Sequence, residues 1–165
     1  MGTNIIKQIV VYIFFILLQV LVLDNVMIFK MFNPILYTLP IIMMPRNTSA
    51  PLLMFLAMIQ GGVIDVFNDT LGVNAAATIF LAFIRNPILS LVDADQAVGD
   101  NKYYTPTKLP GAQYALYICP VVFFHHFALY TLEAFSFSNL PGILLNSLLN
   151  SILTVIILFL FKRWF

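Results

Sequence analysis

The chain has 165 residues, of which 61% are hydrophobic and 9% are charged, and its mean hydropathy is +0.96. Soluble globular domains carry roughly a quarter charged residues, so this composition excludes an ordinary soluble protein and indicates an integral membrane protein. A formal net charge of +1 and the absence of any basic run argue against nucleic-acid binding. The single cysteine, Cys119, excludes an internal disulfide and a cysteine metal cluster.

Two apolar blocks open the chain. Residues 5–23 are long enough to cross a membrane, and because no signal-peptide cleavage site follows them we expect them to remain as a helix, with Gln19 bonded to a neighbouring helix. Residues 26–44 have the right length for a second span. Pro34 and Pro40 interrupt this block, so an oblique or kinked crossing is expected.

Four further spans are predicted along the rest of the chain. A third span at 51–67 and a fourth at 73–91 are separated by a short polar tip. The only long polar segment, 93–110, is a loop of mixed charge. A fifth span at 112–133 and a sixth at 141–161 follow it. We therefore expect an all-α protein with six transmembrane helices in one bundle, a single membrane domain over residues 1–165.

Lysine and arginine positions indicate the orientation of the spans. With six spans and a cytoplasmic N-terminus, seven of the eight Lys and Arg residues lie inside and only Lys30 lies outside. If 26–44 does not span, five spans remain, the N-terminus is outside, and Lys7 and Lys30 exchange places. The charge bias thus places the C-terminus and the 93–110 loop inside in both cases. It does not choose between five and six spans, and we expect six, with both termini cytoplasmic.

The stretch 60–77, QGGVIDVFNDTLGVNAAA, is predicted to form the outer hairpin between the third and fourth spans. Steps of four residues place Ala57, Gly61 and Asp65 on one helical face, so the carboxylate should point into protein. Asn74 opens the next helix with small residues, and we expect it to lie near Asp65. The candidates for helix packing or partner binding are Ala57, Gly61, Gly62, Asp65, Gly72, Asn74 and Ala75.

Three interpretations of Asp65 remain open from the sequence. It is a helix-terminal acid in contact with water, a buried and hydrogen-bonded acid that holds the hairpin or a partner, or part of an ion or proton relay. No second acid lies nearby within a predicted membrane segment, which argues against the relay.

A second group of polar residues lies deep in the predicted spans. His126 and Glu133 share a face of the fifth span, which suggests either a metal or proton-transfer site or hydrogen bonds between helices. Zinc sites take three or four ligands and the chain has two histidines, so hydrogen bonding is favoured and no metal is expected. On the sixth span the polar side chains form a stripe that either packs on another helix or lines an aqueous path. The candidates for a polar network are Gln19, His125, His126, Glu133, Asn146 and Asn150.

No combination of nucleophile, base and orienting acid is present, and Gly61–Gly62 is not followed by the lysine of a phosphate-binding loop. The residues therefore predict a small membrane bundle that is not an enzyme and carries no cofactor.

The segments G-G-V-I-D-V-F at 61–67 and L-G-V-N-A-A-A at 71–77 resemble the MreD family of bacterial rod shape-determining membrane proteins. The resemblance extends to L-L-Q-V-L-V-L at 17–23, F-H-H-F-A-L-Y at 124–130 and L-E-A-F-S-F at 132–137, and is strongest to the Bacteroidetes version. It implies a six-helix protein of the bacterial cytoplasmic membrane, distantly similar in fold to the substrate-binding subunits of ECF vitamin transporters.

The partners that this resemblance implies are MreC, the actin-like MreB, RodA and the elongation-specific transpeptidase of the penicillin-binding class, together with membrane lipid. The implied function is a non-catalytic scaffold for cell elongation. The rival interpretation is a small-molecule-binding subunit of a transporter, which would need an outward pocket with convergent polar groups.

Overall fold

A computed structural model of the chain describes residues 3–24, 34–92, 105–136 and 138–162. This part of the chain is helical and contains no strand, which confirms the all-α prediction. Its elements are α1 (Thr3–Leu18), a π-helical turn (Gln19–Leu23), α2 (Leu39–Ile42), α3 (Ala50–Phe67), α4 (Val73–Val92), a 3₁₀ turn (Pro106–Lys108), α5 (Gly111–Ala134) and α6 (Leu140–Phe161). The five long helices begin and end within two residues of the expected bounds.

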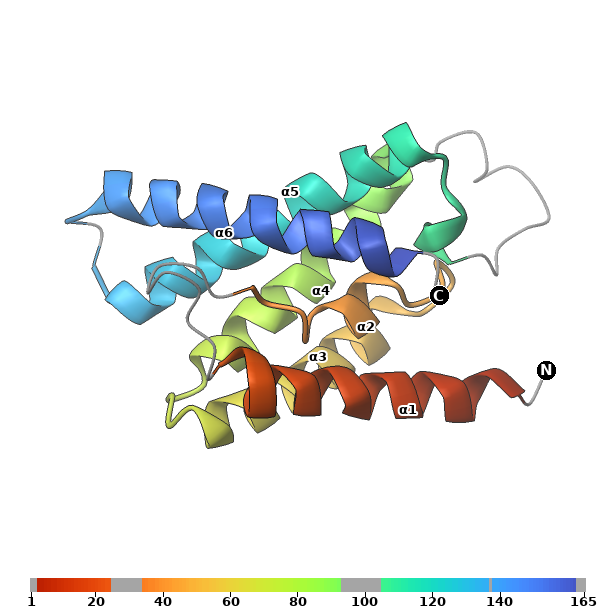
Figure 1. The fold of residues 1–165 in the computed structure, drawn as a ribbon, viewed down its shortest axis with the longest axis horizontal. Coiled ribbons are helices and arrows are strands. Elements are labelled where there is room, and N and C mark those ends of the chain that lie inside the picture. The colour runs from red at the N-terminus through yellow and green to blue at the C-terminus, as the bar shows by residue number, and fades with distance from the viewer. Residues whose placement is uncertain (1–2, 25–33, 93–104, 137, 163–165) are drawn as a thin grey trace.

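The long helices cross one another at an angle, and α1, α3 and α5 end at the side of the molecule where α4 and α6 begin (Figure 1). The start of α1 and the end of α6 lie at the same end of the molecule (Figure 1). The end that holds the α3–α4 turn is called the hairpin end below.

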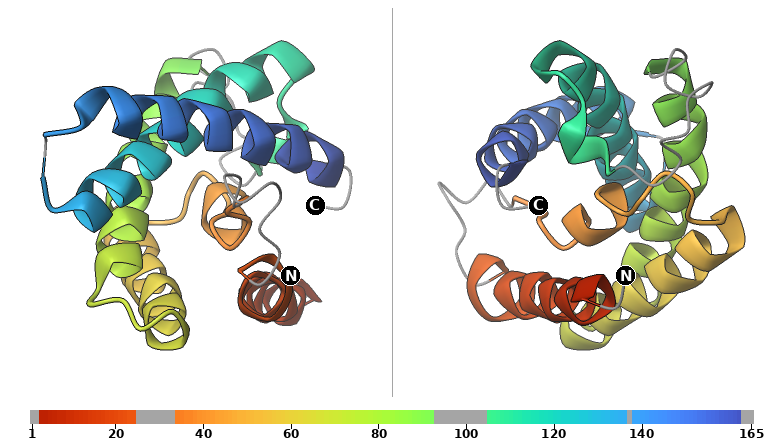
Figure 2. Two further views of the ribbon diagram at one scale, coloured as in Figure 1. Left: turned by 60° about the vertical axis from the view of Figure 1, so that its left-hand side comes forward. Right: turned by 90° about the vertical axis from the view of Figure 1, so that its right-hand side faces the viewer.

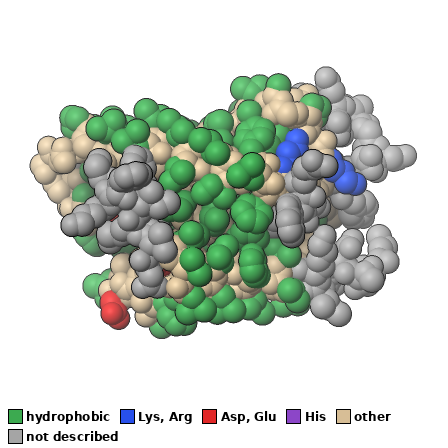
Figure 3. Space-filling view, in the orientation of Figure 1, with side chains coloured by type: hydrophobic (Ala, Val, Ile, Leu, Met, Phe, Trp, Pro, Cys, Tyr) green, Lys and Arg blue, Asp and Glu red, His purple; other side chains and the backbone are tan. Residues whose placement is uncertain are grey.

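In the described chain, four helices, α3, α4, α5 and α6, are long and apolar enough to span a membrane, and residues Gln8–Leu23 form a shorter apolar helix. On the face shown in Figure 3, described charged side chains lie only toward the two ends, and hydrophobic side chains cover much of the described surface between them. Exposed large apolar side chains such as Phe83, Leu116 and Leu160 are expected where a helix faces lipid. These features make the chain a multi-pass membrane protein.

The prediction of a second long helix over residues 26–44 is wrong for residues 34–44. Residues 25–33 lie outside the part of the chain that the structure describes. Residues 34–44, called the central segment below, form two turns and the short helix α2. Pro40 explains the difference, because its ring would clash with the carbonyl of Leu36 in a continuous helix. That carbonyl instead accepts a hydrogen bond from the amide of Leu39 at 3.0 Å.

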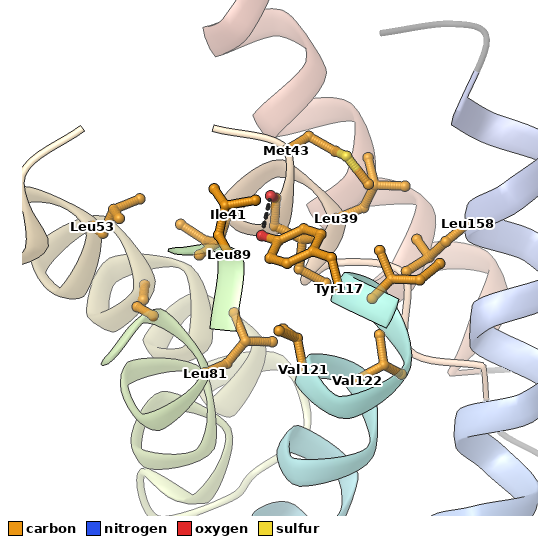
Figure 4. Packing of buried hydrophobic residues seen from close by; sticks show 14 of the residues in the cluster. Leu39, Ile41, Met43, Leu53, Leu81, Leu89, Tyr117, Val121, Val122 and Leu158 are labelled. Atoms are coloured by element: carbon orange, nitrogen blue, oxygen red, sulfur yellow. Dashed lines mark hydrogen bonds between the residues drawn. The ribbon is translucent and has the colours of Figure 1, made fainter. Parts of the chain in front are cut away.

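The central segment passes through the middle of the bundle, and the end-on view shows α2 enclosed by the long helices (Figure 2). Residues 34–43 are all buried. Around it lies the main hydrophobic core, where Leu39 and Ile41 meet Leu81 of α4 and Val121 of α5 (Figure 4). Irregular backbone is tolerated at membrane depth only when protein surrounds it, so the central segment needs partners for its peptide groups.

Candidate functional site

Side chains of all five long helical elements supply those partners. The buried side chain of Gln19, in the π-helical turn that continues α1, accepts a hydrogen bond from the amide of Leu36 at 2.8 Å and donates to the carbonyl of Pro34 at 3.4 Å. Gln60 of α3 donates to the carbonyl of Tyr37. Gln19 was expected to bond a neighbouring helix, and it bonds irregular backbone instead.

Arg85 of α4 holds the other end of the central segment. Its side chain is fully buried, with Nε 3.2 Å from the carbonyl oxygen of Ile42 and Nη2 donating to the carbonyl of Met44. Tyr117 of α5 donates to the same Ile42 carbonyl at 2.8 Å, as the dashed line in Figure 4 shows. A guanidinium has five donors and no acceptor, so it suits a site where several carbonyls converge.

Thr154 of α6 connects the central segment to the histidines. Its hydroxyl accepts from the amide of Ile35 at 3.3 Å and lies 3.4 Å from Nε2 of His126. Nδ1 of His126 lies 2.9 Å from the carbonyl of Val122 and therefore carries the proton. Nε2 is then an acceptor, and the Thr154 hydroxyl donates to it.

We expect Thr154→Val to destabilise the protein by about 1–3 kcal/mol, because it leaves the buried amide of Ile35 and Nε2 of His126 unpaired at nearly constant volume. Thr154→Ser keeps the hydroxyl and serves as the matched control. Thermal unfolding of the detergent-purified variants measures the difference. Equal melting temperatures for the Val and Ser variants would show that the hydroxyl does not support the central segment.

The hairpin between α3 and α4 is closed by Asp65, which is 5% exposed. Its Oδ1 accepts from the backbone amide and the side-chain amide of Asn74, at 2.9 and 3.1 Å, and from the hydroxyl of Thr70. Its Oδ2 accepts from the backbone amide of Ala75 at 2.9 Å. The carboxylate thus caps the free amides in the first turn of α4, where negative charge is also stabilised by the helix dipole. Of the three interpretations of Asp65, the structure shows the buried, hydrogen-bonded acid.

Gly61 allows this contact. A Cβ added there would lie 2.5 Å from Cα of Ala75 and 2.6 Å from the carbonyl oxygen of Asn74, which are backbone atoms of α4. Ala57, one turn earlier on the same face, is fully buried. The small face of α3 therefore packs directly on the first turn of α4, as expected.

A chain of hydrogen bonds joins the hairpin to α5. Because Asp65 only accepts, the Asn74 amide group points its nitrogen at Asp65 and its oxygen at Tyr37, whose hydroxyl donates to it at 3.0 Å. The Tyr37 hydroxyl has one proton, so Nε2 of His125, 3.4 Å away, is the donor in that pair. Nδ1 of His125 is left as a buried acceptor without a partner in the described part of the chain.

Some predicted site residues lie elsewhere. Gly62 is half-buried, and a Cβ added there would meet nothing within 4 Å, so it takes no part in the helix contact. Gly72 is needed for its backbone, since its φ of +83° favours glycine in the tip. Asn146 was expected in the polar network, but its side chain is exposed, and Asn150 donates to its carbonyl oxygen at 3.0 Å. Glu133 is also exposed and makes no hydrogen bond with the described residues.

The network contains residues that sequence reasoning did not select, namely Tyr37, Gln60, Arg85 and Tyr117. Arg85 was counted only as a cytoplasmic charge. Its position could have indicated a buried role, because Arg85 lies inside the predicted span 73–91, and charged residues within spans are rare and usually face the interior of the bundle.

A cavity of about 240 Å³ lies at the hairpin end. Its lining includes the buried residues Gln19, Tyr37 and Asn74 and the exposed residues Asn68 and Glu133. The remaining lining residues are Asp24, Ile35, Ile64, Thr70, Leu129 and Tyr130. The structure thus has a pocket with converging polar groups, which the rival interpretation requires.

Comparison of the chain with protein-family models, with curated proteins and with solved structures finds no match.

Proposed function

We propose that the chain is a non-catalytic scaffold of the bacterial cell-elongation complex, of the MreD type. It binds MreC in the cytoplasmic membrane and helps to organise MreB, RodA and the elongation transpeptidase around peptidoglycan synthesis. Both termini are cytoplasmic in this proposal, and the hairpin end faces outward. The resemblance at 61–67 and 71–77 is its basis.

The observation that carries the proposal is the construction of this hairpin. The residues that carry the resemblance also form a close backbone approach between α3 and α4, through Gly61, and the Asp65 cap. The tip beyond this contact presents apolar side chains outward, with Val66 77% and Leu71 97% exposed. A rigid turn with an exposed apolar tip is suited to contact another protein.

Capture of MreC from membranes of cells that express both proteins tests the scaffold. We expect the unaltered chain to retain MreC through detergent purification. Asp65→Leu leaves the amides of Asn74 and Ala75 unpaired, at about 1–3 kcal/mol each, and should lose MreC and cell-shape rescue. Asp65→Asn keeps one oxygen for Thr70 and Asn74 and loses mainly the bond from Ala75. This variant should therefore retain most of the MreC capture and most of the cell-shape rescue.

Leu71→Ser serves as a variant that leaves the fold intact, because this side chain is almost fully exposed. It should reduce MreC capture at normal protein yield. The scaffold proposal is wrong if the unaltered, correctly inserted chain fails to retain MreC. If Asp65→Asn abolishes shape rescue as fully as Asp65→Leu while MreC is still captured, a titrating role replaces the structural role of Asp65.

A second candidate function is a small-molecule-binding subunit of a transporter, distantly similar to the substrate-binding components of ECF transporters. The specific observation in its favour is the cavity at the hairpin end, which is lined by both buried and exposed polar side chains. Direct ligand binding to the purified chain tests this candidate separately from MreC capture.

A further inference from the structure

The cavity at the hairpin end is lined by two carboxylates from different elements. Asp24 follows the π-helical turn and accepts hydrogen bonds from two neutral amides, Gln19 at 2.7 Å and Asn68 at 3.2 Å. Glu133, in the last turn of α5, makes no hydrogen bond or ion pair with the described residues. No lysine or arginine is among the lining residues that the structure describes.

Helix ends add to this negative potential. The cavity lies where three helical elements finish, because Asp24 caps the π-helical turn, Asn68 caps α3, and Glu133 lies one residue before the end of α5. The carboxyl end of a helix carries a partial negative charge, which favours a cation within about one turn. The neighbouring positive end of α4 is already capped by Asp65.

The rest of the lining indicates an organic cation. Tyr37 and Tyr130 provide aromatic rings, and Ile35, Ile64 and Leu129 provide apolar surface. Within the described residues no three His, Cys, Asp or Glu side chains are grouped to hold a metal ion. A water molecule takes about 30 Å³ of liquid volume, so the cavity of about 240 Å³ suits a group of a few heavy atoms.

We propose that this cavity binds a primary alkylammonium group, with Asp24 and Glu133 as its anionic acceptors and the tyrosine rings beside it. A primary ammonium has three donors, which match carboxylate oxygens better than a quaternary ammonium does. The group is either a free amine or the headgroup of an aminophospholipid, since the cavity lies at one end of the membrane-spanning bundle. The inference deepens the small-molecule candidate and does not depend on the scaffold function.

Binding of n-butylammonium to the full chain in phosphatidylglycerol nanodiscs, followed by calorimetry or thermal shift, tests the site. We expect saturable binding that butanol does not reproduce and that tetramethylammonium reproduces only weakly. Glu133→Gln should weaken binding at least about tenfold, because it removes a charge-assisted acceptor. Asp24→Asn should have a similar effect, and MreC capture should be unchanged in the Glu133→Gln variant.

Asp69→Asn is the matched control, because Asp69 is an exposed acid at the same end that does not line the cavity. The proposal is overturned if the unaltered chain shows no saturable binding, or if Asp69→Asn weakens it as much as Glu133→Gln. Phosphatidylethanolamine nanodiscs identify the source of the group. Weaker apparent binding of butylammonium there supports a lipid headgroup as occupant, and equal binding supports a free amine.

Discussion

Gly61→Ala is expected to destabilise the protein by about 3 kcal/mol or more, the upper range for forced overpacking in a core. The added methyl carbon would lie 2.5 Å from Cα of Ala75, and the atoms that it meets belong to the backbone of α4 and cannot rotate away. At about 2–4 °C per kcal/mol for a chain of this size, the melting temperature should fall by roughly 6–12 °C. Thermal unfolding of the detergent-purified protein measures it.

The control for this prediction is the adjacent glycine. Gly62 lies in the same helix, and a methyl group added there meets nothing within 4 Å. Alanine is favoured over glycine in a helix by about 1 kcal/mol, so Gly62→Ala should leave the melting temperature unchanged or raise it slightly. Similar losses for both variants would mean that α3 does not approach α4 through Gly61.

Gln19→Met is expected to cost about 2–6 kcal/mol, because it leaves two buried groups of the central segment unpaired at about 1–3 kcal/mol each. These groups are the amide of Leu36 and the carbonyl of Pro34, and methionine has a similar length but no comparable donor or acceptor. We expect a low yield of folded protein, and for the fraction that folds a clear fall in melting temperature, both followed by size-exclusion chromatography after heating.

Gln8→Met is the matched substitution, since Gln8 is an exposed residue of α1. It should change neither the yield nor the melting temperature. Gln19→Glu separates the two roles of the side chain, because it still accepts from Leu36 but repels Asp24. An intermediate melting temperature for Gln19→Glu would support the assigned bonds, whereas full stability of Gln19→Met would refute them.

The contact tested by Gly61→Ala can be predicted from the local sequence pattern, whereas the hydrogen bonds tested by Gln19→Met cannot. The contact of Gly61 with α4 could be anticipated, because Ala57, Gly61 and Asp65 recur at helical spacing and the turn that follows is short. Residues this close in sequence have few ways to meet, so the pairing of Asp65 with Asn74 was predicted correctly. For Gln19 the sequence predicted a position deep in the protein but not the correct hydrogen-bond partners. These partners, Leu36 and Pro34, lie in the central segment, beyond the end of the helix that carries Gln19.

The polar stripe of α6 shows the same limit. Helical periodicity places Asn146 and Asn150 on one side, but it does not say where the neighbouring helix stops. In the structure Asn150 and Thr154 are buried while Asn146 is exposed. How far a polar stripe is covered depends on the length and tilt of other elements, which no local pattern contains.

By itself the sequence determined the membrane class, the all-helical structure, the bounds of five long helices and the small-residue contact of the hairpin. These features depend on hydrophobicity and on periodicity within a single helix or a short turn. Only the tertiary structure decided that the central segment is irregular, that Arg85 and Thr154 hold it, and that Asp24 and Glu133 share a cavity. The physical reason is that a buried peptide group takes whichever donor or acceptor is nearest in space, and here that partner lies on a helix distant in sequence.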